Sequence, residues 1–164
     1  MQNFFDIGSG DKQCLGITKC ASCGRLGSPD SPKLLQSGSG DKKILLVGSQ
    51  PSKKDDEIGN LANSSFWSRV ELFLKAHKIN MRKDCWIMNS VACHGSSPKP
   101  KHIECCNPAI RKFIEDNNPR LILAFGMNAT RALLDWKKDF GGIQKWRGFT
   151  IPQPPHSIQP SLPH

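Results

Sequence analysis

The sequence lacks a long apolar run, an apolar leader and any evident internal repeat. A helix needs about 18 or more consecutive apolar residues to span a membrane, and no such run occurs in the 164 residues. Residues 1–12 are polar and lack the basic flank and apolar stretch of a secretory signal. We therefore expect an intracellular protein, in the cytoplasm or the nucleoid, with no membrane partner. Its length suits a single domain over residues 1–164.

Acidic residues are scarce relative to basic ones. The chain carries 23 Lys and Arg against 14 Asp and Glu, which gives a net charge of +9 and a pI of about 9.4. Basic proteins of this size often bind polyanions, because neutralised phosphates release counterions. A solvated basic surface is the alternative interpretation, and charge alone does not decide between the two.

The cysteine count is odd, which argues against a closed set of disulfides. Seven cysteines occur in a chain without a secretory signal, in surroundings that keep thiols reduced. Metal binding is therefore the leading explanation. Cys20 and Cys23 form a CxxC pair, whose turn aims both thiolates at one centre. Cys93 and either Cys105 or Cys106 complete a set of four, which suits zinc or a 4Fe–4S cluster.

Two further cysteines are predicted to be free thiols. These are Cys14 and Cys85, and Cys85 should lie in the core because it opens an apolar strand. The alternative for the other cysteines is a group of buried thiols that hold no metal. Their spacing alone does not choose among zinc, a cluster and free thiols.

Apolar patterning predicts alternating strands and helices. Short continuous apolar runs predict buried strands, and apolar residues three and four apart predict helices. The predicted strands cover residues 42–48, 84–92, 120–126 and 147–151, and the predicted helices cover 66–77, 102–116 and 128–134. Residues 1–41 should be irregular around the cysteine pair, 49–65 a polar loop, and 152–164 a proline-rich tail.

This alternation predicts the fold class and the place of a site. Continuous apolar strands between helices are typical of a mostly parallel sheet covered on both faces. We predict an α/β three-layer sandwich around a central four-stranded sheet. Ligands of such sheets bind beyond the carboxyl ends of the strands. The segments expected there are 48–52, 89–93, 126–128 and His156.

Several motifs follow one another along the chain. Residues 43–56 read KILLVGSQPSKKDD, an apolar strand, a Gly-x-x-Pro turn and an acidic pair. Residues 89–93 read NSVAC, residues 103–108 read IECCNP, and residues 119–126 read PRLILAFG. A Pro-His-Ser triplet follows at 155–157. In this order the motifs resemble the iron–sulfur type, family 4, of the uracil-DNA glycosylase superfamily.

The resemblance covers nearly the whole chain and implies a cofactor and a partner. It implies a 4Fe–4S cluster on Cys20, Cys23, Cys93 and Cys106, with zinc as the alternative cofactor. Such a cluster would staple the N-terminal segment to the loop before the last cluster cysteine, which is a structural role. The resemblance also implies a monomer whose partner is DNA.

The resemblance further implies the chemistry of individual residues. A uracil-DNA glycosylase flips uracil, or a related modified pyrimidine, out of the stack and hydrolyses its N-glycosidic bond. Phe66 would be the stacking platform, Asn89 the reader of the uracil edge, and His156 the donor to charge developing on uracil O2. Gly48 and Gln50 would border the base. On their residue types alone, Phe66 could be a core aromatic, Asn89 a turn cap and His156 an exposed bystander.

The first motif departs from the family pattern. Ser49 stands where the family usually has Glu, and Gln50 follows it. Gln50 is no general base, although its amide can orient water. Asp55 or Asp56 could supply a carboxylate, or could be a loop residue or helix cap. The alternative function is therefore a catalytically weak or inactive DNA-binding, damage-sensing protein on the same scaffold.

DNA contacts are expected from basic and polar side chains, together with apolar wedges. We assign contacts to Ser52, Lys53, Lys99, Lys101, Ser157 and Ile158. Ile158 and Leu162 are candidate wedges for the gap left by a flipped base. Some relatives with Gln in the first motif bond covalently to DNA through a His in a basic loop, and His102 is the residue that could do so here. A zinc-knuckle nucleic-acid protein unrelated to glycosylases is the remaining alternative.

Overall fold

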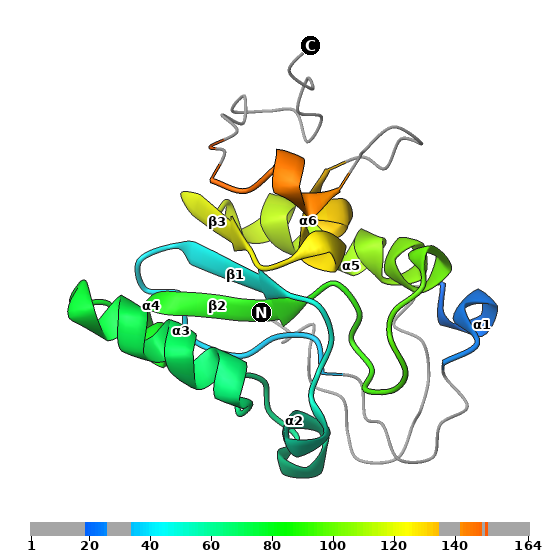
Figure 1. The fold of residues 1–164 in the computed structure, drawn as a ribbon, viewed down its shortest axis with the longest axis horizontal. Coiled ribbons are helices and arrows are strands. Elements are labelled where there is room, and N and C mark those ends of the chain that lie inside the picture. Colours follow the sequence, from blue (N-terminus) through cyan, green and yellow to red (C-terminus); the bar gives the residue numbers. More distant parts are fainter. Residues whose placement is uncertain (1–18, 26–33, 135–141, 149, 151–164) are drawn as a thin grey trace.

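The computed structural model describes residues 19–25, 34–134, 142–148 and 150, and its centre is a parallel sheet (Figure 1). The strands are β1 (Ile44–Gly48), β2 (Cys85–Asn89) and β3 (Leu121–Ala124). Their order is β2-β1-β3, and both neighbours run parallel to β1. Gly48, the last residue of β1, pairs with Asn89, the last residue of β2. The carboxyl ends of the two strands therefore meet at one edge.

The sheet has three strands in the described residues, whereas the sequence predicted four. Arg147 and Gly148, which open the predicted fourth strand, lie in a turn after the short 3-10 helix η1 (Ile143–Lys145). Residues 149 and 151 lie outside the described residues. β3 is correspondingly an edge strand in this part of the chain, and Leu121 on it is 46% exposed.

Alternate residues of β1 face opposite sides of the sheet, as the pleat of a strand requires. Ile44 and Leu46 belong to one buried apolar cluster, and Leu45 and Val47 belong to another. The first cluster includes residues of α3 (Ser65–Ala76) and α4 (Met81–Asp84), and the second includes residues of α5 (Pro100–Asn117) and α6 (Met127–Leu133). Figure 1 shows these helices on the two sides of the sheet. Helices therefore cover both faces, as predicted.

The three longer helices fall where apolar spacing predicted them, with shifted ends. α5 begins at Pro100, which suits a helix start because proline lacks the N–H that a first turn leaves unpaired. It ends at Asn117 and is followed by the cap residue Asn118, which takes the left-handed conformation with φ 45°. No helix in the described ranges is long and apolar enough to cross a membrane.

Two of the short helices that the sequence did not predict depend on capping rather than on apolar spacing. α2 (Lys53–Ile58) lies in the predicted polar loop, and Ser52 and Asp55 form a capping box at its start. The Asn80 side chain accepts hydrogen bonds from two backbone N–H groups at the start of α4. The described part of the cysteine segment contains α1 (Cys20–Cys23), a single turn capped by Gly24.

A buried carboxylate ties the end of α4 to the turn that precedes β1. Asp84 Oδ2 accepts a hydrogen bond from Asn80 N at 2.8 Å and lies 3.0 Å from Lys42 Nζ. The backbone hydrogen bond from Asn80 and the contact with Lys42 lower the pKa of Asp84. A depressed folded-state pKa contributes stability above the unfolded pKa, and this stability is lost as pH falls through the folded value.

Substituting Asp84 should therefore destabilise the protein at neutral pH. We expect Asp84→Asn to unfold at lower urea concentration than the wild type at about pH 7, and the difference to shrink toward about pH 3 as the wild-type carboxylate protonates. Urea midpoints measured across this range provide the test. Asp41→Asn, at an exposed position nearby, is the matched control. A gap that does not depend on pH would contradict the prediction.

Candidate functional site

The carboxyl edge of the sheet places Asn89 beside Gly48. The Asn89 side chain is 4% exposed and lies over the backbone of Gly48. A Cβ at Gly48 would lie 2.5 Å from Asn89 Oδ1 and 2.9 Å from the indole of Trp67. Glycine is therefore required at position 48 if the Asn89 amide is to keep its place.

The Asn89 amide is buried without hydrogen-bond partners in the described residues. Neither its Nδ2 nor its Oδ1 meets a partner within that part of the chain. A buried amide left unpaired costs about 1–3 kcal/mol, so most such groups are satisfied in native proteins. An amide in this state at a strand end has a donor and an acceptor available for a ligand.

Phe66 lies at the start of α3, in contact with two other aromatic rings. Its ring centroid is 5.1 Å from that of Trp67 and 5.4 Å from that of Phe125, both in edge-to-face geometry. Trp67 is buried, whereas Phe66 is 43% exposed. Trp67 also borders Gly48, so the aromatic group adjoins the Asn89 amide. Phe66 is therefore a supported, partly exposed ring rather than a core residue.

Ser49, which stands where the family usually has a carboxylate, is held by hydrogen bonds from residues that follow the neighbouring strands. Ser49 Oγ accepts a hydrogen bond from Asn128 Nδ2 at 2.9 Å. The Ser49 carbonyl accepts hydrogen bonds from the Ser90 hydroxyl and from Val91 N. Sequence reasoning pointed to the segments that hold Ser90 and Asn128 but gave neither residue a role. Their positions directly after strands were the signal.

Gln50 follows β1 and has both ends of its amide engaged. Its Oε1 accepts a hydrogen bond from Arg25 Nη2 at 3.0 Å, and its Nε2 donates to the Gly95 carbonyl at 2.9 Å. Arg25 Nη2 also donates to the Ser96 carbonyl. Arg25 lies just after the CxxC pair, and no sequence pattern singled it out. The structure thus connects the cysteine segment to the first motif through one guanidinium.

The two candidate carboxylates have different environments. Asp55 is 1% exposed, and its carboxylate accepts hydrogen bonds from Ser52 N at 2.8 Å and from the Ser52 hydroxyl at 2.6 Å. It also accepts hydrogen bonds from Asn63 N and Nδ2. Asp55 therefore holds α2 and the loop after it, which is the capping alternative left open by the sequence. Asp56 lies in the first turn of α2 and is half-buried.

His102 lies in the first turn of α5 and accepts hydrogen bonds at one ring nitrogen. Its Nδ1 accepts from Lys99 N at 3.1 Å and lies 3.4 Å from Arg25 Nη1. Burial, followed by the charges of Arg25, Lys99 and Lys101, lowers the pKa of His102. A neutral ring that accepts at Nδ1 carries its proton on Nε2. This tautomer leaves no lone pair on Nε2 for attack on a sugar carbon.

The described DNA-binding candidates lie at helix starts. Ser52 caps α2, and Lys53 is exposed and lies 3.7 Å from Glu57. Lys99 and Lys101 are exposed at the start of α5. The remaining candidates lie outside the described residues, and these are His156, Ser157, Ile158 and Leu162.

Most of the candidate metal-binding cysteines are buried near α5. Cys20, Cys23, Cys93 and Cys105 are buried, whereas Cys106 is half-buried. α1 lies against α5, where Lys19 N donates to the Cys105 carbonyl at 3.1 Å (Figure 1). Cys14 lies outside the described residues.

The thiols of this group influence one another. Burial raises the pKa of Cys106 to about 11, and a hydrogen bond with the Ala92 backbone opposes the rise. Repulsion from Cys23, Cys93 and Cys20 adds to it. Burial, followed by the charge of Cys23, likewise raises the pKa of Cys105. A cationic iron or zinc centre would relieve this repulsion, so the chemistry of these thiols favours a metal centre, although their arrangement in the described residues does not form one.

No three Cys, His, Asp or Glu side chains in the described ranges are arranged to hold a single metal ion.

Cys85 is separate from the other cysteines, since it is fully buried in the apolar cluster under α3 and α4. Burial, followed by the charge of Asp84, raises the pKa of Cys85 to about 11. Cys85 is therefore a core thiol, as the sequence predicted.

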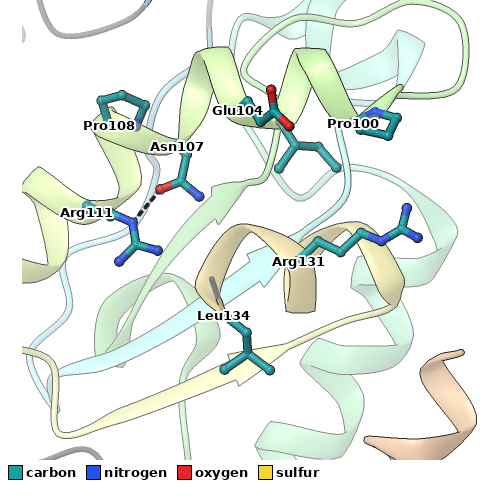
Figure 2. A pocket seen from close by; sticks show the side chains of 8 residues that line it. Pro100, Glu104, Asn107, Pro108, Arg111, Arg131 and Leu134 are labelled. Carbon is teal, nitrogen blue, oxygen red and sulfur yellow. Dashed lines mark hydrogen bonds between the residues drawn. The ribbon is translucent and has the colours of Figure 1, made fainter. Parts of the chain in front are cut away.

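A separate pocket of about 410 Å³ lies between α5 and α6 (Figure 2). Arg111 Nε donates to Asn107 Oδ1 at 2.7 Å on its wall, and Asn107 Nδ2 donates to the Ala132 carbonyl at 2.7 Å. Arg131 and Leu134 line its other side, from α6 and the residue that follows it. None of the candidate site residues lines this pocket, so it is distinct from the carboxyl edge.

Two comparisons with known proteins bear on the family of this chain. A family model described as the uracil DNA glycosylase superfamily matches residues 35–159. A type-4 uracil-DNA glycosylase of Thermotoga maritima is 28% identical over 138 residues, which cover 82% of this chain and 70% of that protein. Because the family model matches well over half of this sequence, the chain belongs to the uracil DNA glycosylase superfamily.

Proposed function

We propose that this protein is a DNA glycosylase that flips uracil, or a related modified pyrimidine, out of DNA and hydrolyses its N-glycosidic bond. The observation that carries the proposal is the Asn89 amide, which is buried at the carboxyl edge and has no partner among the described residues. Uracil presents an acceptor at O4 and a donor at N3–H. One asparagine amide satisfies both.

Two further groups complete the proposed base site. Phe66 offers a partly exposed ring, held edge-on by Trp67 and Phe125, on which a flipped base can stack. Gly48 leaves room where a side chain would collide with the Asn89 amide. His156, proposed from the family resemblance, would donate a hydrogen bond to the charge that develops on uracil O2.

In the proposed reaction, water would be positioned without the carboxylate that the family usually has in its first motif. The Gln50 amide has one N–H and one lone pair left after its two observed hydrogen bonds, so it can still orient water. Asp56 remains a carboxylate candidate beside Asp55, whose carboxylate accepts four hydrogen bonds within the α2 cap. Uracil is an acidic leaving group, so the bond can break dissociatively with modest help from a base.

We also propose that Cys20, Cys23, Cys93 and Cys106 hold a 4Fe–4S cluster. The burial of Cys20, Cys23 and Cys93, the half-burial of Cys106 and the close approach of α1 to α5 support this assignment. The cluster would have a structural role, since it would tie the N-terminal segment to the loop after β2. Lys99 and Lys101, at the start of α5, would then contact the DNA backbone.

A uracil-release assay tests the proposed function directly. The full-length protein is incubated with a single-stranded oligonucleotide that contains one uracil, and alkali then cleaves any abasic site. We expect a shorter DNA fragment with uracil and none with cytosine at the same position. Intact uracil DNA after long incubation at enzyme excess would contradict glycosylase activity.

One observation favours a second candidate, a catalytically weak DNA-binding protein on the same scaffold. Ser49 replaces the motif carboxylate and is bound by Asn128, while Asp55 is committed to the α2 cap. The same assay separates the two functions if binding is measured beside cleavage. Tighter binding of uracil DNA than of cytosine DNA, without cleavage, would identify the second.

A further inference from the structure

Arg25 contacts three segments that are far apart in the sequence. Its Nη2 donates to Gln50 Oε1 at 3.0 Å, after β1, and to the Ser96 carbonyl in the loop after β2. Its Nη1 lies 3.4 Å from Nδ1 of His102, at the start of α5. The guanidinium is planar and carries five donors, so it can bridge several acceptors at once.

These contacts set the orientation of the Gln50 amide. A guanidinium has donors and no acceptor, so Gln50 must present Oε1 to Arg25. Its Nε2 then faces the Gly95 carbonyl, to which it donates at 2.9 Å. With both ends fixed, the remaining N–H and lone pair of Gln50 point in set directions.

Gly95 keeps the space that Arg25 fills. A Cβ at position 95 would lie 2.8 Å from Arg25 Nη2, and Gly95 has φ +152°, a conformation that side chains rarely adopt. Because a guanidinium ends a flexible side chain, a residue larger than glycine would displace Arg25 from Gln50. Gly95→Ala therefore perturbs the same contact from the opposite side.

We propose that Arg25 is a positioning residue, which fixes the Gln50 amide so that its free N–H and lone pair orient the water used in uracil release. The inference rests on the proposed function, because Gln50 acts on water only if the edge binds a uracil nucleotide. The proposal also gives the cysteine segment a second role, besides that of holding a cluster. That segment would hold the backbone two residues before Arg25 and deliver the guanidinium to the site.

A double-mutant cycle tests whether Arg25 acts through Gln50. We expect Arg25→Ala to slow single-turnover uracil release by about tenfold, and Arg25→Ala on the Gln50→Ala background to cause no further loss. Arg25→Lys keeps the charge but loses the planar guanidinium, and its release rate should fall between those of the wild type and Arg25→Ala. Arg120→Ala, which removes an exposed charge before β3, is the matched control and should keep the wild-type rate. Independent, multiplicative losses in the double variant would overturn the proposal.

The Gln50 side-chain amide signals in an NMR spectrum give a readout that does not depend on activity. We assign them by their absence in Gln50→Ala, and we expect them to shift toward solvent-exposed values in Arg25→Ala and Gly95→Ala. If Arg25→Ala does not fold, the shift in Arg25→Lys decides. Unmoved signals would refute the positioning role. A wild type that releases no uracil would refute the proposed function instead, and the amide signals would still decide whether Arg25 orients Gln50.

Discussion

Asn89→Leu should nearly abolish uracil release while leaving the protein as stable as the wild type or more so. Leucine has a shape close to that of asparagine but makes no hydrogen bonds. The substitution removes a buried amide that has no partner in the described residues, which should raise the free energy of unfolding by roughly 1 kcal/mol. It also removes the proposed reader of uracil O4 and N3–H, which should lower the rate by about 10²–10³-fold.

Asn63→Leu is the matched control for this prediction. The Asn63 amide donates hydrogen bonds to Asp55 Oδ1 at 3.2 Å and to the Asn60 carbonyl at 2.7 Å. Its loss should therefore destabilise the protein by about 1–3 kcal/mol. Urea unfolding and single-turnover release are measured on both variants. A large loss of stability in Asn89→Leu would show that the Asn89 amide supports the fold, contrary to our account.

Cys23→Ala should remove the visible absorption of the purified protein and lower its melting temperature. Loss of one thiolate opens the proposed cluster site, and the binding free energy of a structural metal centre contributes directly to folding. A cost of several kcal/mol corresponds to a fall of roughly 10 °C for a chain of this size. Iron and sulfide content, the visible spectrum and thermal unfolding are the measurements. A colourless wild type that contains zinc would reject the iron–sulfur assignment.

Cys85→Ala is the control for the cysteine series. Cys85 is fully buried and lies in the apolar cluster, so its truncation should cost only about 1–2 kcal/mol and leave the spectrum unchanged.

Cys105→Ala and Cys106→Ala then decide which of the two cysteines is the fourth ligand of the proposed cluster. We expect the spectrum to be lost in Cys106→Ala and kept in Cys105→Ala, and the reverse result would transfer the role to Cys105.

The sheet and its covering helices could be predicted because burial leaves a strong pattern. Residues 44–47 and 85–88 are strands with near-continuous apolar runs, which are typical of a sheet covered on both faces. The place of Asn89 followed from that sheet, because the last residue of a parallel strand projects into the edge where ligands bind. The meeting of Asn89 and Gly48 is therefore a consequence of sheet geometry.

Other features could not be predicted, because they depend on single hydrogen bonds between distant residues. α2 is held by the box of Ser52 and Asp55, and its few apolar residues form no periodic face. From the sequence alone, such polar side chains are equally consistent with a catalytic group and with a helix cap. Arg25 belongs to no motif, and only its contacts with Gln50 and His102 in three dimensions give it a role.

A crystal structure of the full-length protein with bound uracil would test the central claim most directly. We expect Asn89 Nδ2 to lie about 3 Å from uracil O4 and Oδ1 about 3 Å from N3, with the uracil ring stacked on Phe66. Uracil bound elsewhere, or an Asn89 amide already satisfied by another part of the chain, would contradict the account.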